Sequence, residues 1–340
     1  MEKNKINNLP PKIRVIFVIP GVREGMGMIF SKNEADFLRS KDVDVEEFYL
    51  SSRRRPLIIL KELNQLLYKI KEFNPHIIHA QFGGITAFIA AVASLLTRTP
   101  LVINFRGSDL NNTSKADGFL VDIFTSFFSQ VSVLQASGVI CVSTNLLKKV
   151  WLKKKNMRVI PSAIDLDFFY PVPKEEARIR LKWDPNEKVV LFNANNYGLK
   201  RLDLALLSVN RAKRVIPSIR LEVLKGDTPY SLMPLYLNAS DCLLMCSDSE
   251  GSPTIVREAL ACNLPVVSTD IGDVAEQIKD VYPSKISDRD ENKLSESIIN
   301  VISINCRSNG REVLQQRGIS KDLLMRELID LYRSVLIKAR

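Results

Sequence analysis

The alternation of short apolar runs with helical stretches constrains the fold of this chain more than any other feature. Short runs that are apolar on both faces are typical of buried parallel strands, and parallel strands need helical crossovers. The strands expected in the first half are Ile13–Ile19, Val43–Tyr49, Ile77–Ala80, Leu101–Phe105 and Val139–Val142, and those expected in the second half are Val189–Asn193, Ile219–Leu224, Cys242–Met245 and Pro265–Ser268. The pattern predicts an α/β protein with parallel sheets and helices on both faces.

A proline-rich segment divides this alternation into two halves. Residues 160–173 contain three prolines and show no periodicity, which is typical of a domain boundary. A length of 340 residues suggests two domains, and a hydrophobic content of 46% is enough for two cores. We therefore expect domains at residues 1–165 and 166–320, followed by a terminal helix at residues 321–340.

The chain offers little for disulfides, structural zinc or a membrane span. Its five cysteines form no C-x-x-C pair, and its only histidines, His76 and His79, lie in no Cys/His cluster. The longest apolar stretch, residues 85–96, is too short to cross a bilayer and predicts a buried helix. Residues 15–19 are too short for the core of a signal peptide. These features predict a cytoplasmic protein with reduced thiols and no metal.

Residues 250–270 give the most specific functional signal. Ser252 suits a helix N-cap and Pro253 the first helical position, so a helix should begin there. The free amides of Thr254 and Ile255 would then face an anion such as a diphosphate.

Two glutamates flank this helix start. Glu250 should lie in the loop before the helix and Glu258 inside it. Carboxylates accept hydrogen bonds from hydroxyl groups, so sugar and ribose hydroxyls are their natural partners. The two acids and the helix start together predict a site for a nucleotide sugar.

This stretch resembles the signature of the retaining glycosyltransferases of family 4, which have the GT-B fold. The shared pattern is a glutamate, Gly-x-Pro, a second glutamate eight positions after the first, Ala-x-Ala and Pro-Val-Val. The resemblance implies that Glu250 contacts the transferred sugar, that Glu258 contacts the donor ribose and that Gly251 belongs to the donor site. It also implies two Rossmann-like domains facing across a cleft, with the terminal helix crossing back to the first domain. Asn263 replaces a common glycine, and both residue types tolerate a left-handed helix end.

Three other turns extend the resemblance around the donor. Residues 193–201 match the place where the family carries an Arg and a Lys for the diphosphate; Lys200 matches the Lys, and Arg201 is a candidate substitute for the Arg. A solvated Lys–Arg pair remains the alternative. Gly226 lies where the base pocket is expected, and Gly21 opens a glycine turn at residues 20–27 that can bring amides near phosphate.

The acceptor side departs from the family pattern. Residues 78–83 resemble a strand that ends in His-Ala-His, with His79 in the first position and Gln81 in place of the second His. His79 is either a packed histidine or an acceptor-side residue. Residues 104–109 resemble the His-Gly-x-Asp element and contain Asp109, but Arg106 stands where His is common. Arg106 cannot act as a base, so it would bind the donor sugar or an acidic acceptor.

Positive charge is concentrated in the first half. Residues 1–165 contain 23 Lys/Arg and 14 Asp/Glu, a net charge of +9, whereas residues 166–340 contain 25 and 24, a net charge of +1. Basic residues gather at positions 53–55 and at 148–155, where five lysines flank Trp151 and Leu152. This second cluster is either a solvated face or a contact with an anionic membrane. Nucleic acid is disfavoured because the chain lacks the interleaving of aromatic and basic residues that proteins use to stack on single strands.

The resemblance implies metal-independent transfer of a hexose-type sugar, with retention, from a nucleotide-diphosphate donor to a glycan or lipid-linked acceptor. Glu250, Lys200 and Arg106 are the candidate catalytic residues, and no cofactor is expected. The Asp165-Leu-Asp167 sequence superficially matches a metal motif, but its linker context argues against a metal. The open alternatives are a catalytically silent partner subunit and another GT-B enzyme, such as an epimerase. A phosphorylase and a dehydrogenase are disfavoured because their cofactor motifs are missing.

Overall fold

The computed structural model describes residues 10, 12–23, 28–52, 55–110, 119–195 and 197–339. The chain divides into two compact units. Unit 1 comprises Met1–Ala163 together with Asp322–Arg340, and unit 2 comprises Ile164–Lys321. The boundaries expected from the sequence lie within two residues of these divisions. The expected cleft between the domains stays a prediction.

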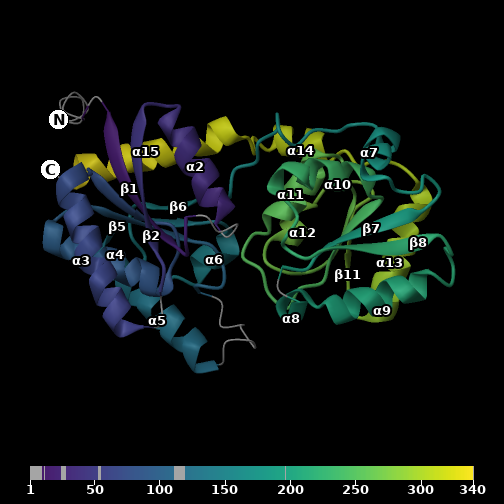
Figure 1. Ribbon diagram of the computed structural model, residues 1–340, viewed down its shortest axis with the longest axis horizontal. Helices are drawn as coiled ribbons and strands as arrows, with labels where there is room; N and C mark the ends of the chain where they lie inside the picture. The colour runs from purple at the N-terminus through teal and green to yellow at the C-terminus, as the bar shows by residue number, and fades with distance from the viewer. Residues whose placement is uncertain are drawn as a thin grey trace. The chain divides into compact units, whose positions relative to one another are not determined.

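Unit 1 is built on a six-stranded parallel sheet of order β2-β1-β3-β4-β5-β6 (Figure 1). Its strands are β1 (Ile13–Pro20), β2 (Val43–Leu50), β3 (Ile77–Ala80), β4 (Leu101–Phe105), β5 (Ala136–Cys141) and β6 (Met157–Val159). Its helices are α2 (Ile29–Arg39), α3 (Pro56–Phe73), α4 (Gly84–Thr97), α5 (Phe119–Gln135), α6 (Thr144–Lys148) and α15 (Lys321–Ala339). The central strands β3 and β4 are fully buried, which explains their continuous apolar runs.

The terminal helix α15 packs on the sheet of unit 1. Gly138 lies in β5, and a Cβ atom added there would lie 3.2 Å from Val335 and 3.5 Å from Leu331, two side chains of α15. Tyr332 of the same helix is fully buried. The apolar face of α15 therefore covers β5 closely and contributes a polar group to the interior of unit 1.

Unit 2 contains a five-stranded parallel sheet of order β11-β10-β9-β7-β8 (Figure 1). Its strands are β7 (Lys188–Asn193), β8 (Ile219–Leu224), β9 (Cys242–Met245), β10 (Val266–Thr269) and β11 (Lys285–Ser287). Its helices are α7 (Lys174–Leu181), α8 (Tyr197–Lys200), α9 (Leu202–Ala212), α10 (Met233–Ala239), α11 (Thr254–Ala261), α12 (Val274–Gln277), α13 (Glu291–Ile304) and α14 (Gly310–Gln316), with a 3₁₀ turn at Tyr230–Leu232.

All nine strands expected from the sequence are present in the structure. The two short strands β6 and β11, of three residues each, were missed because runs of that length carry no periodicity. The expected buried helix at residues 85–96 is α4. All five cysteines are free thiols. Within the described ranges, no helix combines the length and apolar character needed to cross a bilayer.

The strand order of each sheet reverses at one point. In unit 1 the chain passes from β1 to β2 on one side and to β3 on the other, and in unit 2 it passes from β7 to β8 and then across to β9. Ligands of open α/β sheets bind outside the carboxyl ends of the strands at such a point. In unit 2 this rule selects the loops that follow β7 and β9.

Candidate active site

The loops after β7 and β9 bring Lys200 and Glu250 together. Lys200 ends the short helix α8, and Glu250 lies between β9 and α11. The Nζ atom of Lys200 donates to Oε1 of Glu250 over 2.6 Å. Their side chains are 17% and 14% exposed, respectively. This ion pair therefore lies where a ligand could reach it, at the carboxyl edge of the sheet.

Gly272 fixes the position of the Glu250 loop. It follows β10 with φ +59°, a conformation that side chains with a Cβ adopt rarely. A Cβ atom there would lie 3.0 Å from the carbonyl oxygen of Gly251 and 3.1 Å from that of Glu250. A glycine is thus required both for the backbone conformation and for the close approach of the two loops.

Ser252 does not cap helix α11, contrary to the prediction from the sequence. The helix begins at Thr254, Pro253 occupies the cap position, and no side chain caps the helix. The Ser252 hydroxyl donates to Asp273 over 2.8 Å and accepts from Arg257 over 2.6 Å. Arg257 and Asp273 form a buried ion pair at 3.2 Å. The Ser252 hydroxyl therefore bonds to this pair instead of to the helix amides.

Helix α11 contains the first-turn amides of Thr254 and Ile255 and the side chain of Glu258. Thr254 and Ile255 are the first two residues of the helix, so their N–H groups have no carbonyl partner within it. Glu258 is the fifth residue and is buried, and burial raises its pKa to about 7. The hydroxyl of Tyr230 donates to Glu258 over 3.4 Å.

Arg201 is engaged with acids beside the site. It pairs with Asp203 at 2.8 Å and with Asp248 at 3.3 Å. Arg289 approaches the same Asp248 carboxylate at 2.8 Å. Arg201 therefore contributes to a mixed charge cluster next to Lys200.

Of the two other glycines predicted for the donor site, Gly226 lies in unit 2 and Gly21 lies in unit 1. Gly226 has φ +91°, and a Cβ atom there would lie 3.0 Å from Oδ1 of Asn195, so the turns after β7 and β8 are in close contact. The amide of Gly21 donates to the carbonyl of Leu50 over 2.8 Å and is used inside unit 1. Asn196, Gly25 and Gly27 lie outside the described residues.

Arg106 is enclosed by polar groups of unit 1. Its guanidinium donates to Oε1 of Gln81 over 2.6 Å, to Ser162 over 3.1 Å and to Glu34 over 3.3 Å. It also lies over the ring of Phe30, 3.8 Å from the centroid. Arg106 thus connects the loop after β3, helix α2 and the segment around Ser162.

Asp109 is buried and bound to the backbone. Its carboxylate accepts from the amides of Gly83 at 3.0 Å, Arg106 at 3.0 Å and Gly107 at 2.7 Å. Burial raises the pKa of Asp109, and these hydrogen bonds oppose the rise. Asp109 therefore joins the turns that follow β3 and β4.

His79 is a fully buried residue of β3. Its Nδ1 lies 2.7 Å from the hydroxyl of Tyr332 on α15. Burial, reinforced by the charge of Arg106, lowers the pKa of His79 to about 3, so the ring is neutral at physiological pH. This contact connects β3 with the terminal helix α15, between residues that are 253 positions apart in the sequence.

Sequence reasoning missed several partners of the site. Tyr230, Asp248 and Asp273 touch predicted site residues but belong to no local pattern that was recognised. Gly272 could have been found, because a glycine three positions after a buried strand can mark a close approach of two loops. The Asp165 carboxylate accepts from Asp167 N and pairs with Lys321 at 3.0 Å, as a linker feature would. No group of three potential metal ligands occurs among residues whose placement is described.

Two family descriptions match this chain. "Glycosyltransferase Family 4" matches residues 28–168, and "Glycosyl transferases group 1" matches residues 220–320. The first match lies almost entirely in unit 1, and the second lies in unit 2 and contains Glu250 and Glu258.

Individual relatives agree with these matches. The chain is 29% identical over 242 residues to TuaC of Bacillus subtilis (strain 168), which bears the name of a teichuronic acid biosynthesis glycosyltransferase. That alignment covers 66% of this chain but only 59% of TuaC. A UDP-Gal:alpha-D-GlcNAc-diphosphoundecaprenol alpha-1,3-galactosyltransferase of Escherichia coli is 22% identical, with 83% of this chain and 84% of the relative covered.

Solved structures share the fold over nearly the whole chain. A glycosyltransferase from Rickettsia africae superposes with a TM-score of 0.72 at 16% identity, covering 96% of this chain and 99% of the other. Anabaena HepE, solved with UDP and glucose, gives a TM-score of 0.68 at 14% identity, covering 94% and 98%. With both halves matched and the two parallel sheets in place, the chain belongs to the family 4 glycosyltransferases with the GT-B fold.

Proposed function

We propose that this protein transfers a hexose-type sugar, with retention of configuration, from a nucleotide diphosphate to a glycan or lipid-linked acceptor in cell-surface polysaccharide biosynthesis. The observation that carries this proposal is the Lys200–Glu250 pair at the carboxyl edge of the unit 2 sheet, next to the first turn of α11. The pair supplies a cation and a carboxylate, and α11 adds two first-turn amides without a carbonyl partner in the helix and the buried Glu258, groups that would suit a nucleotide sugar.

Each group has a role in the proposed reaction. Lys200 and the amides of Thr254 and Ile255 would stabilise the negative charge that develops on the departing diphosphate. Glu250 would orient the sugar, and Glu258 would accept hydrogen bonds from the ribose hydroxyls. A bound diphosphate would compete with Glu250 for Lys200, so donor binding would release the carboxylate toward the sugar.

Two names among the similar proteins support the donor and acceptor classes. HepE was solved with UDP and glucose, and the Escherichia coli relative is named for a UDP-Gal donor and a diphosphoundecaprenol acceptor. We extend only these chemical classes to this chain: a nucleotide-diphosphate sugar and an acceptor on a lipid diphosphate or glycan. A lipid-linked acceptor would bring the protein to the cytoplasmic face of a membrane.

Lys200 and the helix amides also motivate a proposal of metal-independent transfer. These groups can neutralise a diphosphate without a divalent ion. Assays in excess EDTA should retain activity. Loss of activity that magnesium or manganese restores would contradict this part of the proposal.

A thermal-shift screen with UDP, GDP, ADP and their sugars tests the donor site. A ligand that binds only the folded protein raises its melting temperature by mass action. One nucleotide series should stabilise the protein, and release of that nucleotide from its sugar should follow. A nucleotide that binds without turnover would favour a silent subunit, and no response to any nucleotide would refute the donor site.

A further inference from the structure

Helix α5 carries an exposed apolar stripe that the proposed reaction does not use. Phe124 is 59% exposed and Phe127 is 50% exposed, and Leu134 is also exposed. With Val131 these residues follow helical spacing, so they lie along one face of α5. Their exposure is visible only in the structure.

The lysine-rich loop at residues 148–155 adjoins this stripe. The side chain of Gln130, between Phe127 and Leu134 on α5, accepts from Trp151 N over 3.0 Å and donates to the carbonyl of Lys149 over 2.9 Å. Gln130 is buried, so these bonds anchor the loop on the helix. The ammonium of Lys154 reaches the carbonyl of Leu134 over 2.9 Å.

The combined surface is basic as well as apolar. Trp151 is 72% exposed, and Lys148, Lys149, Lys153 and Lys155 are exposed around it. Residues 123–164 contain five lysines and one arginine but no Asp or Glu. Exposed aromatic side chains beside several lysines complement the headgroups and the acyl boundary of an anionic bilayer.

We propose that the α5 stripe and the loop at residues 148–155 form one membrane-docking face, whose partner is an anionic lipid bilayer. Phe124, Phe127 and Trp151 insert at the headgroup level, and the lysines contact the lipid phosphates. The docking face itself is argued from exposure and charge. Only its purpose, access to a lipid-linked acceptor, rests on the proposed function.

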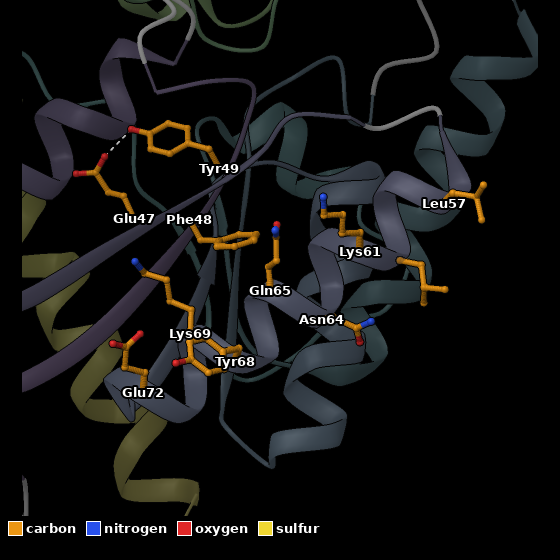
Figure 2. Close-up of a pocket in the computed structure, with 11 residues that line it drawn as sticks. Glu47, Phe48, Tyr49, Leu57, Lys61, Asn64, Gln65, Tyr68, Lys69 and Glu72 are labelled. Carbon is orange, nitrogen blue, oxygen red and sulfur yellow. Dashed lines mark hydrogen bonds between the residues drawn. The ribbon is translucent and has the colours of Figure 1, made fainter.

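A groove elsewhere on unit 1 provides a matched comparison. It has a volume of about 840 Å³ and lies between β2 and α3 (Figure 2). Leu57 at its rim is 84% exposed, and Leu60 is also exposed. Its charged lining residues are two acids and two lysines: Glu47, Glu72, Lys61 and Lys69. The charged residues that line this groove balance, although positions 53–55 before it are basic, so it tests whether exposed apolar groups with a neutral lining select anionic lipid.

The test is cosedimentation of the full chain with phosphatidylcholine vesicles, with and without phosphatidylglycerol. The wild type should bind the anionic vesicles, and added salt should weaken binding. Changing Lys153, Lys154 and Lys155 together to Ser should weaken partitioning on the order of 100-fold, from about 1 kcal/mol per lysine and a factor of ten per 1.4 kcal/mol. The Phe124→Ser/Phe127→Ser variant should lose roughly tenfold or more. The Leu57→Ser/Leu60→Ser control should bind as the wild type does.

The melting temperature of each variant shows whether it is folded, so a loss of binding is not mistaken for unfolding. Tryptophan fluorescence supplies a second readout. In a Trp183→Phe background Trp151 is the remaining tryptophan, and its emission should shift to shorter wavelength with anionic vesicles. Absence of vesicle binding by the wild type, or equal binding by folded variants, would overturn the proposal. A dimer that the Phe variant dissociates, without vesicle binding, would also overturn it. Nucleotide binding without vesicles should be unchanged, so failure of docking is distinguishable from failure of the donor site.

Discussion

In unit 2 the Lys200–Glu250 pair is partly open to solvent, whereas Arg106 and Asp109 of unit 1 are buried and bonded to their own unit. Lys200 and Glu250 share one ion pair at the sheet edge. Arg106 and Asp109 are surrounded by backbone amides and side chains of three neighbouring loops. A partly exposed ion pair can exchange partners with a ligand at a small cost in free energy. A buried network is strongly destabilised when one member is removed.

The difference teaches that resemblance to one family does not give its residues equal roles. The unit 2 residues are expected to act on ligand binding and turnover, and the unit 1 residues mainly on stability. Substitutions in the two units can therefore separate the two kinds of contribution.

The largest effect is expected for Lys200→Ala. Removing one electrostatic stabiliser of a leaving group should lower turnover by roughly tenfold to a thousandfold. Steady-state kinetics with the donor found in the screen is the measurement. Lys293→Ala removes an exposed lysine that also pairs with a glutamate, at 3.2 Å, and is the matched control. Wild-type turnover in Lys200→Ala would transfer the role to Arg201 or the neighbouring turn.

Asp109→Ala tests the structural role of unit 1. The change leaves three amides without their acceptor, two of them in buried hydrogen bonds, and each buried group costs about 1–3 kcal/mol. We expect the free energy of unfolding to fall by about 3 kcal/mol or more in urea titrations. Asp36→Ala, at an exposed surface pair, should stay within about 0.5 kcal/mol. A stable Asp109→Ala protein that has lost turnover would break the comparison.

Glu258 sharpens the comparison because it is buried yet belongs to unit 2. At pH 8, where Glu258 is ionised, Glu258→Ala should weaken nucleotide binding by about 1.5–3 kcal/mol, through loss of hydrogen bonds to a charged acceptor. Calorimetry measures this change. Unchanged affinity would remove the ribose role.

The pKa of Glu258 also predicts a pH dependence of stability. Its folded value, about 7, lies above the ordinary glutamate value, so the folded protein keeps a proton that the unfolded chain has released. The stabilisation by this proton is present below the ordinary value and is lost as pH rises through about 7. The melting temperature of Glu258→Gln relative to wild type should therefore be higher at pH 8 than at pH 5.5. An equal difference at both pH values would contradict the raised pKa.

The smallest effect is expected for Tyr332→Phe. It removes one hydroxyl from the buried contact with His79 and should reduce stability by about 1 kcal/mol, with no change in kcat or KM. Thermal unfolding and kinetics check both parts. Tyr282→Phe, at an exposed tyrosine, should change neither. A kinetic defect without loss of stability would give His79 a part in the reaction.

Local patterns in the sequence determined the parallel sheets, the positions of their central strands and the place of Glu250 and Glu258 around one helix start. These features depend on residues close in the chain, because apolar periodicity and turn residues act over a few positions. Asn263 illustrates the same point: it ends α11 with φ 55°, the left-handed conformation expected where a glycine is common.

The tertiary structure decided which of these residues are available and which are bound. Ser252 has the local features of a cap, but Asp273, 21 positions later, takes its hydroxyl. Lys200 meets Glu250 across 50 positions, and His79 meets Tyr332 across 253. Such pairings depend on strand order and helix docking, which no short window of sequence contains. Burial then sets their charge state, because removing a group from water changes its pKa and its choice of partner.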